Sequence, residues 1–369
     1  MKAIQWIISA LVAVVIIAAA VGGGVYFTRL KSIHSIRKLT DYEDYNLYRM
    51  DIDYAYDLDR LIDRGITDNQ SMINAILAEA LPYLPIHMKA PNFGCSAFCT
   101  QGTDGHTLMG RNYDFKNDTS AMLVYCTPKD GYASVAFAAL DNINANTPDA
   151  SMAKKLATLT APFICLDGMN EKGVSIAVLT LDSDPTYQQT GKPMIATTLA
   201  IRLVLDRAAT TAEAVELLSK YDMFASSGRD YHFYITDASG DGRVLEYDCN
   251  DPAPPPTGTP SRSVTNFFVM YKDNVLPNQR NGVYGHGRER YDAIEEILDA
   301  NAGSIDREIA WQALQAASQA PNPKDVTSNT QWSILYDNTA LTAEAVIRRD
   351  WNTKTSYDLV SNVAVTDVG

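Results

Sequence analysis

The longest apolar run in the chain lies at its N-terminus. Residues 4–27 are almost entirely hydrophobic, with only Gln5 and Ser9 interrupting near the start. At about 1.5 Å per residue, a helix of this length spans a bilayer core of roughly 30 Å. The apolar core of a signal peptide is usually shorter, about 7–15 residues. We therefore predict a transmembrane anchor within residues 1–28. A cleaved signal segment is the alternative, because small residues occupy positions 18–20.

The charges that flank this segment leave its orientation open. Lys2 precedes it, whereas four basic residues follow it: Arg29, Lys31, Arg37 and Lys38. The positive-inside rule would place the body of the protein in the cytoplasm, whereas a signal-like segment would place it outside. We adopt an extracytoplasmic body, on the resemblance described below. If the segment is a cleaved signal, we expect a secreted protein.

Residues 29–94 form a predicted leader that is polar and rich in Tyr and Asp. Apolar residues recur at helical spacing in two places, Leu58–Ile62 and Ile73–Leu81. Gly65 and Asp68 separate these stretches, and prolines follow the second. The pattern predicts two short helices whose apolar faces pack on the body of the protein.

From residue 95 onward the apolar runs shorten to lengths typical of strands. Two of them, Ser96–Gln101 and Thr107–Phe115, flank a Thr-Asp-Gly turn and predict a hairpin. Further strands are predicted at Met122–Thr127, Ala133–Ala139, Pro162–Asp167, Val174–Leu181, Trp332–Tyr336, Ala343–Asp350 and Tyr357–Val360, with a second hairpin over His232–Tyr247. Helices are predicted at Ile195–Arg207, Thr211–Tyr221, Tyr291–Ala300 and Asp306–Ala317, and a proline-rich loop at 252–260. Strands, then helices, then strands indicate an α+β fold of packed layers.

Composition and charge narrow the classes of function. The 369 residues are 46% hydrophobic and 20% charged, which allows a sizeable globular core. The net charge of −13 disfavours contact with phosphate backbones, so we predict no nucleic-acid partner. The five histidines are scattered without the spacing of metal ligands. We therefore predict surface or structural roles for them, and neither a metal nor a cofactor.

Five cysteines occur, and none of them forms a CxxC pair: Cys95, Cys99, Cys126, Cys165 and Cys249. This excludes zinc ribbons and thioredoxin-like motifs. An odd number leaves at least one thiol unpaired, which fits one reactive thiol and four that are paired or buried. Cys99 shares a strand face with Cys95, and we predict that it is a packed core residue.

Cys95 begins the first strand of the first hairpin, and Arg111 and Asp114 lie on the second strand. Cross-strand neighbours lie about 5 Å apart, so both side chains can reach the start of the first strand. A guanidinium beside a thiol favours the thiolate, and a carboxylate can bind an ammonium group. On spacing alone, an ordinary hairpin with surface charges explains the pattern at least as well.

The motif Cys-Ser-Ala-Phe from Cys95, followed by Gly-Arg-Asn-Tyr-Asp at 110–114, resembles the choloylglycine hydrolase family. This family includes bile-salt hydrolases and penicillin V acylases, with acid ceramidase and its relatives nearby. The resemblance continues through Gly168–Ala177, Thr265–Asn266, Arg290–Tyr291 and Trp332–Asp337. It implies a four-layer αββα sandwich of the N-terminal-nucleophile (Ntn) hydrolases over residues 95–369. It also implies hydrolysis of a linear carbon–nitrogen amide bond in an N-acyl small molecule.

The resemblance also implies roles for individual residues. Cys95 is the nucleophile, and its own α-amino group, once freed, is the base. Arg111 steadies the thiolate, Asp114 binds the α-amine, and Asn266 supplies an oxyanion-hole donor. Arg290 supports the site, with Arg288 as a competitor because the alignment over Gly285–Tyr291 is loose.

One position departs from the family pattern. Bile-salt hydrolases carry Asn and penicillin acylases carry Tyr where this chain has Thr180. The departure weakens any expectation of bile salts or penicillin V as substrates. The Thr180 hydroxyl or its main chain is therefore only an oxyanion or substrate-side candidate.

The α-amino group of Cys95 does not exist until the bond between Gly94 and Cys95 is cut. Related proteins with leaders cut themselves, through attack of the thiol on the preceding carbonyl group. Gly94 suits this step because a residue without Cβ leaves its carbonyl accessible. The reference pKa values of an α-amine, about 7.7–8.0, and a thiol, about 8.5, allow nearly balanced proton transfer. We predict self-cleavage between Gly94 and Cys95.

Two alternatives share this fold. One is an acyltransferase that passes the acyl group to another amine, which the motifs cannot distinguish from a hydrolase. The other is a membrane-tethered binding protein that is never processed. The expected partners are a small-molecule amide substrate and the membrane, and homo-oligomerisation is left open.

Overall fold

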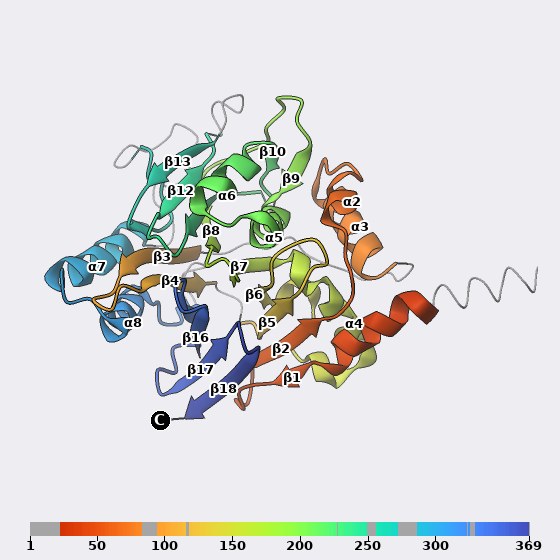
Figure 1. Ribbon diagram of the computed structural model, residues 1–369, viewed down its shortest axis with the longest axis horizontal. Helices are drawn as coiled ribbons and strands as arrows, with labels where there is room; N and C mark the ends of the chain where they lie inside the picture. The colour runs from red at the N-terminus through yellow and green to blue at the C-terminus, as the bar shows by residue number, and fades with distance from the viewer. Residues whose placement is uncertain are drawn as a thin grey trace, which may run out of the picture.

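The computed structural model describes residues 23–82, 94–115, 118–226, 228–248, 256–271, 286–322, 324 and 329–368. The greater part of the predicted membrane segment, residues 1–22, lies outside these ranges, as do Cys249 and the start of the proline-rich loop. Within them, no helix is both long and apolar enough to cross a membrane. Residues 23–34 are helical and lead from the predicted membrane segment into the body of the protein (Figure 1).

Two β-sheets form the centre of the described part of the chain (Figure 1). The larger sheet has nine described strands, in the order β1-β2-β5-β6-β7-β8-β11-β12-β13. Their bounds are β1 Arg37–Lys38, β2 Leu47–Ile52, β5 Ala121–Cys126, β6 Ser134–Ala139, β7 Cys165–Asn170, β8 Ser175–Leu181, β11 Asp230–Thr236, β12 Arg243–Glu246 and β13 Thr257–Pro260. Neighbouring strands are antiparallel, except that β2 runs parallel to β5.

The smaller sheet has seven described strands, in the order β14-β3-β4-β15-β16-β17-β18. Their bounds are β14 Ser263–Val264, β3 Gly94–Gln101, β4 Thr107–Asp114, β15 Thr330–Asp337, β16 Thr342–Ile347, β17 Thr353–Asp358 and β18 Val363–Val368. A separate parallel pair is formed by β9 (Met194–Ala196) and β10 (Asp222–Phe224).

Helices cover the outer face of each sheet (Figure 1). On the larger sheet, α5 (Thr197–Arg207) packs against β7 and β8, and α6 (Thr211–Leu218) against β11. On the smaller sheet, α7 (Gly287–Ala300) packs against β3 and β14, and α8 (Arg307–Ala317) against β4 and β15. The two sheets meet where β3 contacts β8. The predicted αββα sandwich is therefore confirmed.

Aromatic side chains fill the space between the two sheets. The rings of Tyr113 on β4 and Trp332 on β15 stack with centroids 4.1 Å apart. Phe137 on β6 of the other sheet lies with its ring centroid 6.3 Å from that of Trp332. Strands β7, β8 and β15 are buried along their whole length. Full burial is why β8 reads as a nearly continuous apolar run rather than an alternating one.

The turn at residues 170–173, part of the family-like motif, has a structural rather than a chemical role. The Asn170 side chain accepts hydrogen bonds from the N–H groups of Lys172 and Val174 and donates to the main-chain carbonyls of Leu205 and Ala208. Gly173 has φ +75°, and a Cβ atom there would lie 2.2 Å from the Asn338 carbonyl oxygen. Only glycine fits this position without displacing the main chain.

The leader is built into the larger sheet, which the sequence did not predict. Strand β2 pairs with β5 over its whole length, and β1 pairs with β2 at the edge. The predicted leader helices are confirmed as α2 (Leu58–Ile62) and α3 (Asn69–Ala80). The Tyr54 hydroxyl donates to the Leu159 carbonyl oxygen at 2.6 Å, which ties the leader to the body. Leader and body therefore share one hydrophobic core.

The other predicted elements are confirmed to within a few residues, with two exceptions. The predicted strand at 162–167 is a 3₁₀ helix as far as Phe163 and becomes β7 only at Cys165. This run is buried on all sides, so its hydrophobicity does not distinguish helix from strand. The predicted loop at 252–260 ends in the edge strand β13, where proline is tolerated. A final strand, β18, follows the last predicted one. The remaining helices are α4 (Met152–Ala157) and the 3₁₀ turns at Leu140–Ile143 and Pro148–Ala150.

Candidate active site

The hairpin of β3 and β4 places Cys95 near the start of a central strand. Gly94 pairs with Asp114, and Cys95 pairs with Tyr113. The Cys95 side chain is completely buried. In the uncut chain its nitrogen is a peptide N–H, which donates a hydrogen bond to Asn266 Oδ1 at 3.2 Å. The predicted nucleophile thus begins in contact with the predicted oxyanion donor.

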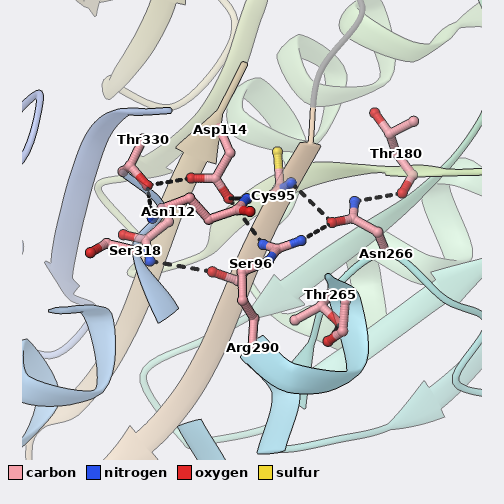
Figure 2. A network of polar contacts seen from close by, with 12 residues as sticks. Cys95, Ser96, Asn112, Asp114, Thr180, Thr265, Asn266, Arg290, Ser318 and Thr330 are labelled. Atoms are coloured by element: carbon pink, nitrogen blue, oxygen red, sulfur yellow. Dashed lines mark hydrogen bonds and ion pairs between the residues drawn. The ribbon is translucent and has the colours of Figure 1, made fainter. Parts of the chain in front are cut away.

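Asn266 follows β14 and connects three parts of the site (Figure 2). Its Oδ1 atom accepts hydrogen bonds from the Cys95 nitrogen and from Arg290 Nη2. Its Nδ2 atom donates to the main-chain carbonyl of Thr180 at 2.6 Å. Two donors facing the oxygen and one acceptor facing the nitrogen fix the orientation of the amide group.

Arg290 and Asp114 form a buried ion pair beside Cys95 (Figure 2). Arg290 Nη1 lies 3.0 Å from Asp114 Oδ2. The same carboxylate accepts hydrogen bonds from the Thr330 hydroxyl at 2.6 Å and from Gln319 Nε2 at 3.3 Å. In the uncut chain Asp114 therefore binds Arg290, and the predicted contact between Asp114 and the Cys95 nitrogen is not formed.

The structure places Arg290, and not Arg288, in the site. Both residues lie in the first turn of α7, which begins at Gly287. The Arg288 guanidinium lies over the ring of Phe267, 4.0 Å from its centroid. The competition between the two arginines is thus resolved in favour of Arg290.

Two of the three guanidinium nitrogens of Arg111 make hydrogen bonds to other residues of the described structure. Its Nε donates to Asp167 Oδ2 at 3.2 Å, and its Nη1 donates to the Asn112 carbonyl at 2.7 Å. Its Nη2 is buried and has no hydrogen-bond partner among the described residues. Asp167 also accepts hydrogen bonds from Trp332 Nε1 at 3.2 Å and the Tyr336 hydroxyl at 2.6 Å. This anchored carboxylate therefore sets the position of the Arg111 guanidinium.

Burial and charge act in opposite directions on the thiol. Burial raises the pKa of Cys95 to about 11, although the guanidinium of Arg111, and more weakly that of Arg290, opposes the shift. The carboxylate of Asp114 adds to the increase. Burial likewise raises the pKa of Asp114, with Arg290 as the main opposing charge. In the uncut chain the Cys95 thiol therefore keeps its proton at neutral pH.

Thr180 contributes to the site through its main chain. Its carbonyl oxygen accepts the hydrogen bond from Asn266 Nδ2. Its hydroxyl is buried and has no hydrogen-bond partner in the described structure. The observed contact thus orients the oxyanion candidate Asn266.

The structure brings all the predicted catalytic residues into one cluster: Cys95, Arg111, Asp114, Asn266 and Arg290, with the main chain of Thr180. Sequence reasoning missed Asp167, although a single Asp inside an apolar strand is a readable signal of a buried partner for a cation. Cys99 is buried, as predicted, and four cysteines are free thiols: Cys95, Cys99, Cys126 and Cys165. Among the described residues, no group of three His, Cys, Asp or Glu side chains could hold a metal ion.

Comparison with known proteins identifies the class of this site. Residues 95–251 match the family described as linear amide C–N hydrolases, choloylglycine hydrolase family. The match begins at Cys95 and supports the predicted family, and the predicted class of enzyme, a hydrolase of linear amides other than peptides, is confirmed.

Two solved structures share the fold. One is a variant of the conjugated bile acid hydrolase from Clostridium perfringens, with a TM-score of 0.55 and 15% identity over 74% of this chain and 97% of that chain. The other is penicillin V acylase from Agrobacterium tumefaciens, with a TM-score of 0.52 and 17% identity over 72% of this chain and 86% of that one. At these identities the similarity establishes the fold.

Proposed function

We propose that this protein is a cysteine Ntn hydrolase that cleaves the amide bond of an N-acyl small molecule. The main support is the convergence of Cys95, Arg111, Asp114, Asn266 and Arg290 in one buried, hydrogen-bonded cluster. The segments that carry them come from β3, β4, α7 and the chain after β14.

Activation is a cleavage of the chain by its own thiol. The Cys95 Sγ attacks the carbonyl carbon of Gly94, and the C–N bond breaks as the Cys95 nitrogen takes a proton. The resulting thioester is hydrolysed by water, which gives a carboxylate at Gly94 and a free α-amine at Cys95. The Asn266 oxygen that accepts the Cys95 N–H holds the scissile peptide in place before this step.

The free α-amine then acts as the base for substrate hydrolysis. It takes the thiol proton, and the thiolate attacks the substrate carbonyl carbon. The tetrahedral oxyanion needs preorganised donors, and Asn266 Nδ2 has a second proton to offer it. The amine product leaves with a proton from the α-ammonium, and water then hydrolyses the thioester to release the carboxylic acid. Asp114 and Arg290 fix the positions of the charges around the α-amine.

We propose that the leader stays bound after cleavage. Strand β2 is paired along its length with β5, so departure of the leader would leave β5, a nearly fully buried strand, with one unpaired edge. Many apolar leader side chains are fully buried, among them Leu47, Met50, Leu61 and Ile76. At roughly 1.5–3 kcal/mol for each such side chain, this surface binds the leader strongly.

A bound leader would also tether the enzyme to a membrane. We propose that residues 4–27 form an anchor and that the body lies outside the cytoplasm. The helix at residues 23–34 continues from this segment, and Arg29 within it donates to the main-chain carbonyls of Glu79 and Ala80. The anchor would thus be attached to the body without a long linker.

The direct test compares Cys95→Ala with Cys99→Ala. We expect Cys95→Ala to remain a single chain and to lose hydrolysis of a panel of N-acyl amino acids and fatty amides by at least about 1,000-fold. Cys99→Ala, on the same strand face, should cleave itself and keep its activity within about twofold. Full hydrolysis by Cys95→Ala would refute the proposed nucleophile.

A further inference from the structure

A buried histidine–glutamate pair contacts the segment that carries Asn266. His232 on β11 and Glu246 on β12 are neighbours across the two strands, next to the paired residues Phe233 and Leu245. Both side chains are completely buried, and His232 Nδ1 lies 3.0 Å from Glu246 Oε1. The catalytic steps described above use neither residue.

Both members of the pair also hold the main chain on either side of Asn266. His232 Nε2 lies 2.8 Å from the carbonyl oxygen of Thr265, which directly precedes Asn266. The N–H groups of Val269 and Met270 donate to Glu246 Oε1 and Oε2, each at 2.7 Å. The residues before and after Asn266 are therefore fixed to one buried pair.

The donors and acceptors around the pair constrain where its protons lie. A carbonyl oxygen only accepts, so the His232 Nε2 facing Thr265 carries a proton. Glu246 receives a main-chain N–H on each of its oxygens, which is the arrangement of a carboxylate. With Glu246 ionised, His232 Nδ1 also donates to it and the ring is an imidazolium. Such a pair is stable in a buried site only while both partners are present.

We infer that His232 and Glu246 form a charged clamp that positions Asn266 for self-cleavage and for amide hydrolysis. This inference rests on the proposed function of Asn266. Its side chain must meet the Cys95 nitrogen, Arg290 and the Thr180 carbonyl together (Figure 2). If the clamp is broken, the main chain of residues 265–270 loses three of its fixed contacts, and Asn266 moves relative to Cys95. His232 and Glu246 are thus positioning residues.

The charge of the clamp can be measured without any assay of activity. In the full-length protein labelled with ¹⁵N-histidine, His232 should show two ring N–H signals at neutral pH, assigned by their loss in His232→Gln. His106 serves as the control, because its ring lies on the surface with Nδ1 2.8 Å from Asp337. A single ring N–H signal for His232 would overturn the charged pair.

Kinetics then test the positioning role. Gln at position 232 can donate to the carbonyl of Thr265 or to Glu246, but not to both. We expect His232→Gln to lower kcat and the rate of self-cleavage by about 10- to 100-fold per folded molecule, with KM within about twofold. His106→Gln should keep both within about twofold. An unchanged kcat per folded molecule in His232→Gln would show that the pair is merely structural.

These outcomes are separable from failure of the proposed function. If Cys95→Ala keeps full activity, the proposed nucleophile is wrong, whereas the ring N–H signals still decide the charge of the pair. If His232→Gln does not fold, Glu246→Asp provides the second variant, because it keeps the charge but shortens the reach to Val269 and Met270. It should show two His232 ring signals together with a lowered kcat. Retention of full kcat by Glu246→Asp would overturn the inference.

Discussion

Cys95 and Cys99 lie four residues apart on β3, and both are buried, yet guanidinium groups act on the thiol of Cys95, whereas among the described residues only carboxylate charges act on that of Cys99. Burial raises the pKa of both thiols, to about 11 for Cys95 and about 12 for Cys99. Around Cys95 the guanidinium groups of Arg111 and Arg290 oppose this shift. Around Cys99 the nearby charges are the carboxylates of Asp237 and Asp241, which increase it.

The difference teaches that burial and strand position alone do not distinguish the proposed nucleophile, Cys95, from Cys99. The two cysteines share a strand, a face and a low exposure, so what separates them is the charge brought by neighbouring elements. Arg111 comes from the adjacent strand β4, and Arg290 comes from α7, nearly 200 residues along the chain from Cys95. The candidate active site thus lies at the end of β3 to which the two arginines are brought.

Among the variants that test this comparison, we expect the largest loss of self-cleavage and hydrolysis when one of the two arginines is removed. Arg290→Gln leaves the Asp114 carboxylate buried without its ion-pair partner, so we expect self-cleavage and hydrolysis to fall by at least about 100-fold. Arg288→Gln is the matched control, two residues away on the same helix, and should stay within about twofold. Both are measured by the rate of chain cleavage on gels and by kcat/KM. Equal losses in the two variants would contradict the assignment of Arg290.

Removing the charge that holds Arg111 in place should have a smaller effect on activity. Asp167→Asn removes the charge that anchors Arg111, and we expect kcat to fall by about 10- to 100-fold per folded molecule, because the guanidinium loses its fixed position. Asp206→Asn serves for comparison, because it breaks another buried ion pair that lies away from the site. In that pair Arg202 Nε donates to Asp206 Oδ1 at 2.8 Å.

Both variants should lose stability, on the order of 3 kcal/mol in urea unfolding, because each leaves a buried guanidinium uncompensated. Only Asp167→Asn should lower the activity of the molecules that remain folded. A comparable loss of kcat in Asp206→Asn would mean that Asp167 acts through stability alone.

The last expected effect is on stability rather than on activity, and it concerns Asp230, a buried acid for which no ion pair is found among the described residues. Burial raises the pKa of Asp230 from 3.8 to about 7. The folded protein therefore binds a proton that the unfolded chain releases near pH 4, so stability falls as the pH rises from about 4 through about 7. At pH 8 this loss is on the order of 2–4 kcal/mol. Asp230→Asn should flatten the dependence of Tm on pH over this range, as measured by thermal unfolding. An unchanged slope would contradict this assignment.

Local patterns predicted the hairpin that carries Cys95, Arg111 and Asp114, but not the residues that surround it. Cys95, Arg111 and Asp114 are brought together by a single turn, so their spacing in the sequence suffices. Choosing between Arg288 and Arg290 requires the residue at which α7 begins, since a shift of two positions turns a side chain to another face of the helix. The role of Asp167 depends on the pairing of the two sheets, which no local pattern specifies.

The leader likewise shows that local patterns predict helices but not strand pairing between distant parts of the chain. Its two helices follow from apolar spacing around Leu58–Ile62 and Ile73–Leu81. Strand β2, with the sequence Leu-Tyr-Arg-Met-Asp-Ile, contains two charged residues and looks like part of a polar linker. Its partner β5 begins about 70 residues later, and parallel pairing over that distance leaves no turn signal in the sequence.

The N-terminus of the active enzyme tests the account most directly. We predict that intact-mass analysis of purified, active protein will find a fragment of residues 95–369, 275 residues (369 minus 94). N-terminal sequencing of that fragment should begin Cys-Ser-Ala-Phe, and the leader should co-purify with it as a separate chain. Active enzyme in which the bond between Gly94 and Cys95 is wholly uncut would contradict the N-terminal-nucleophile mechanism, because Cys95 would then have no α-amine to act as the base.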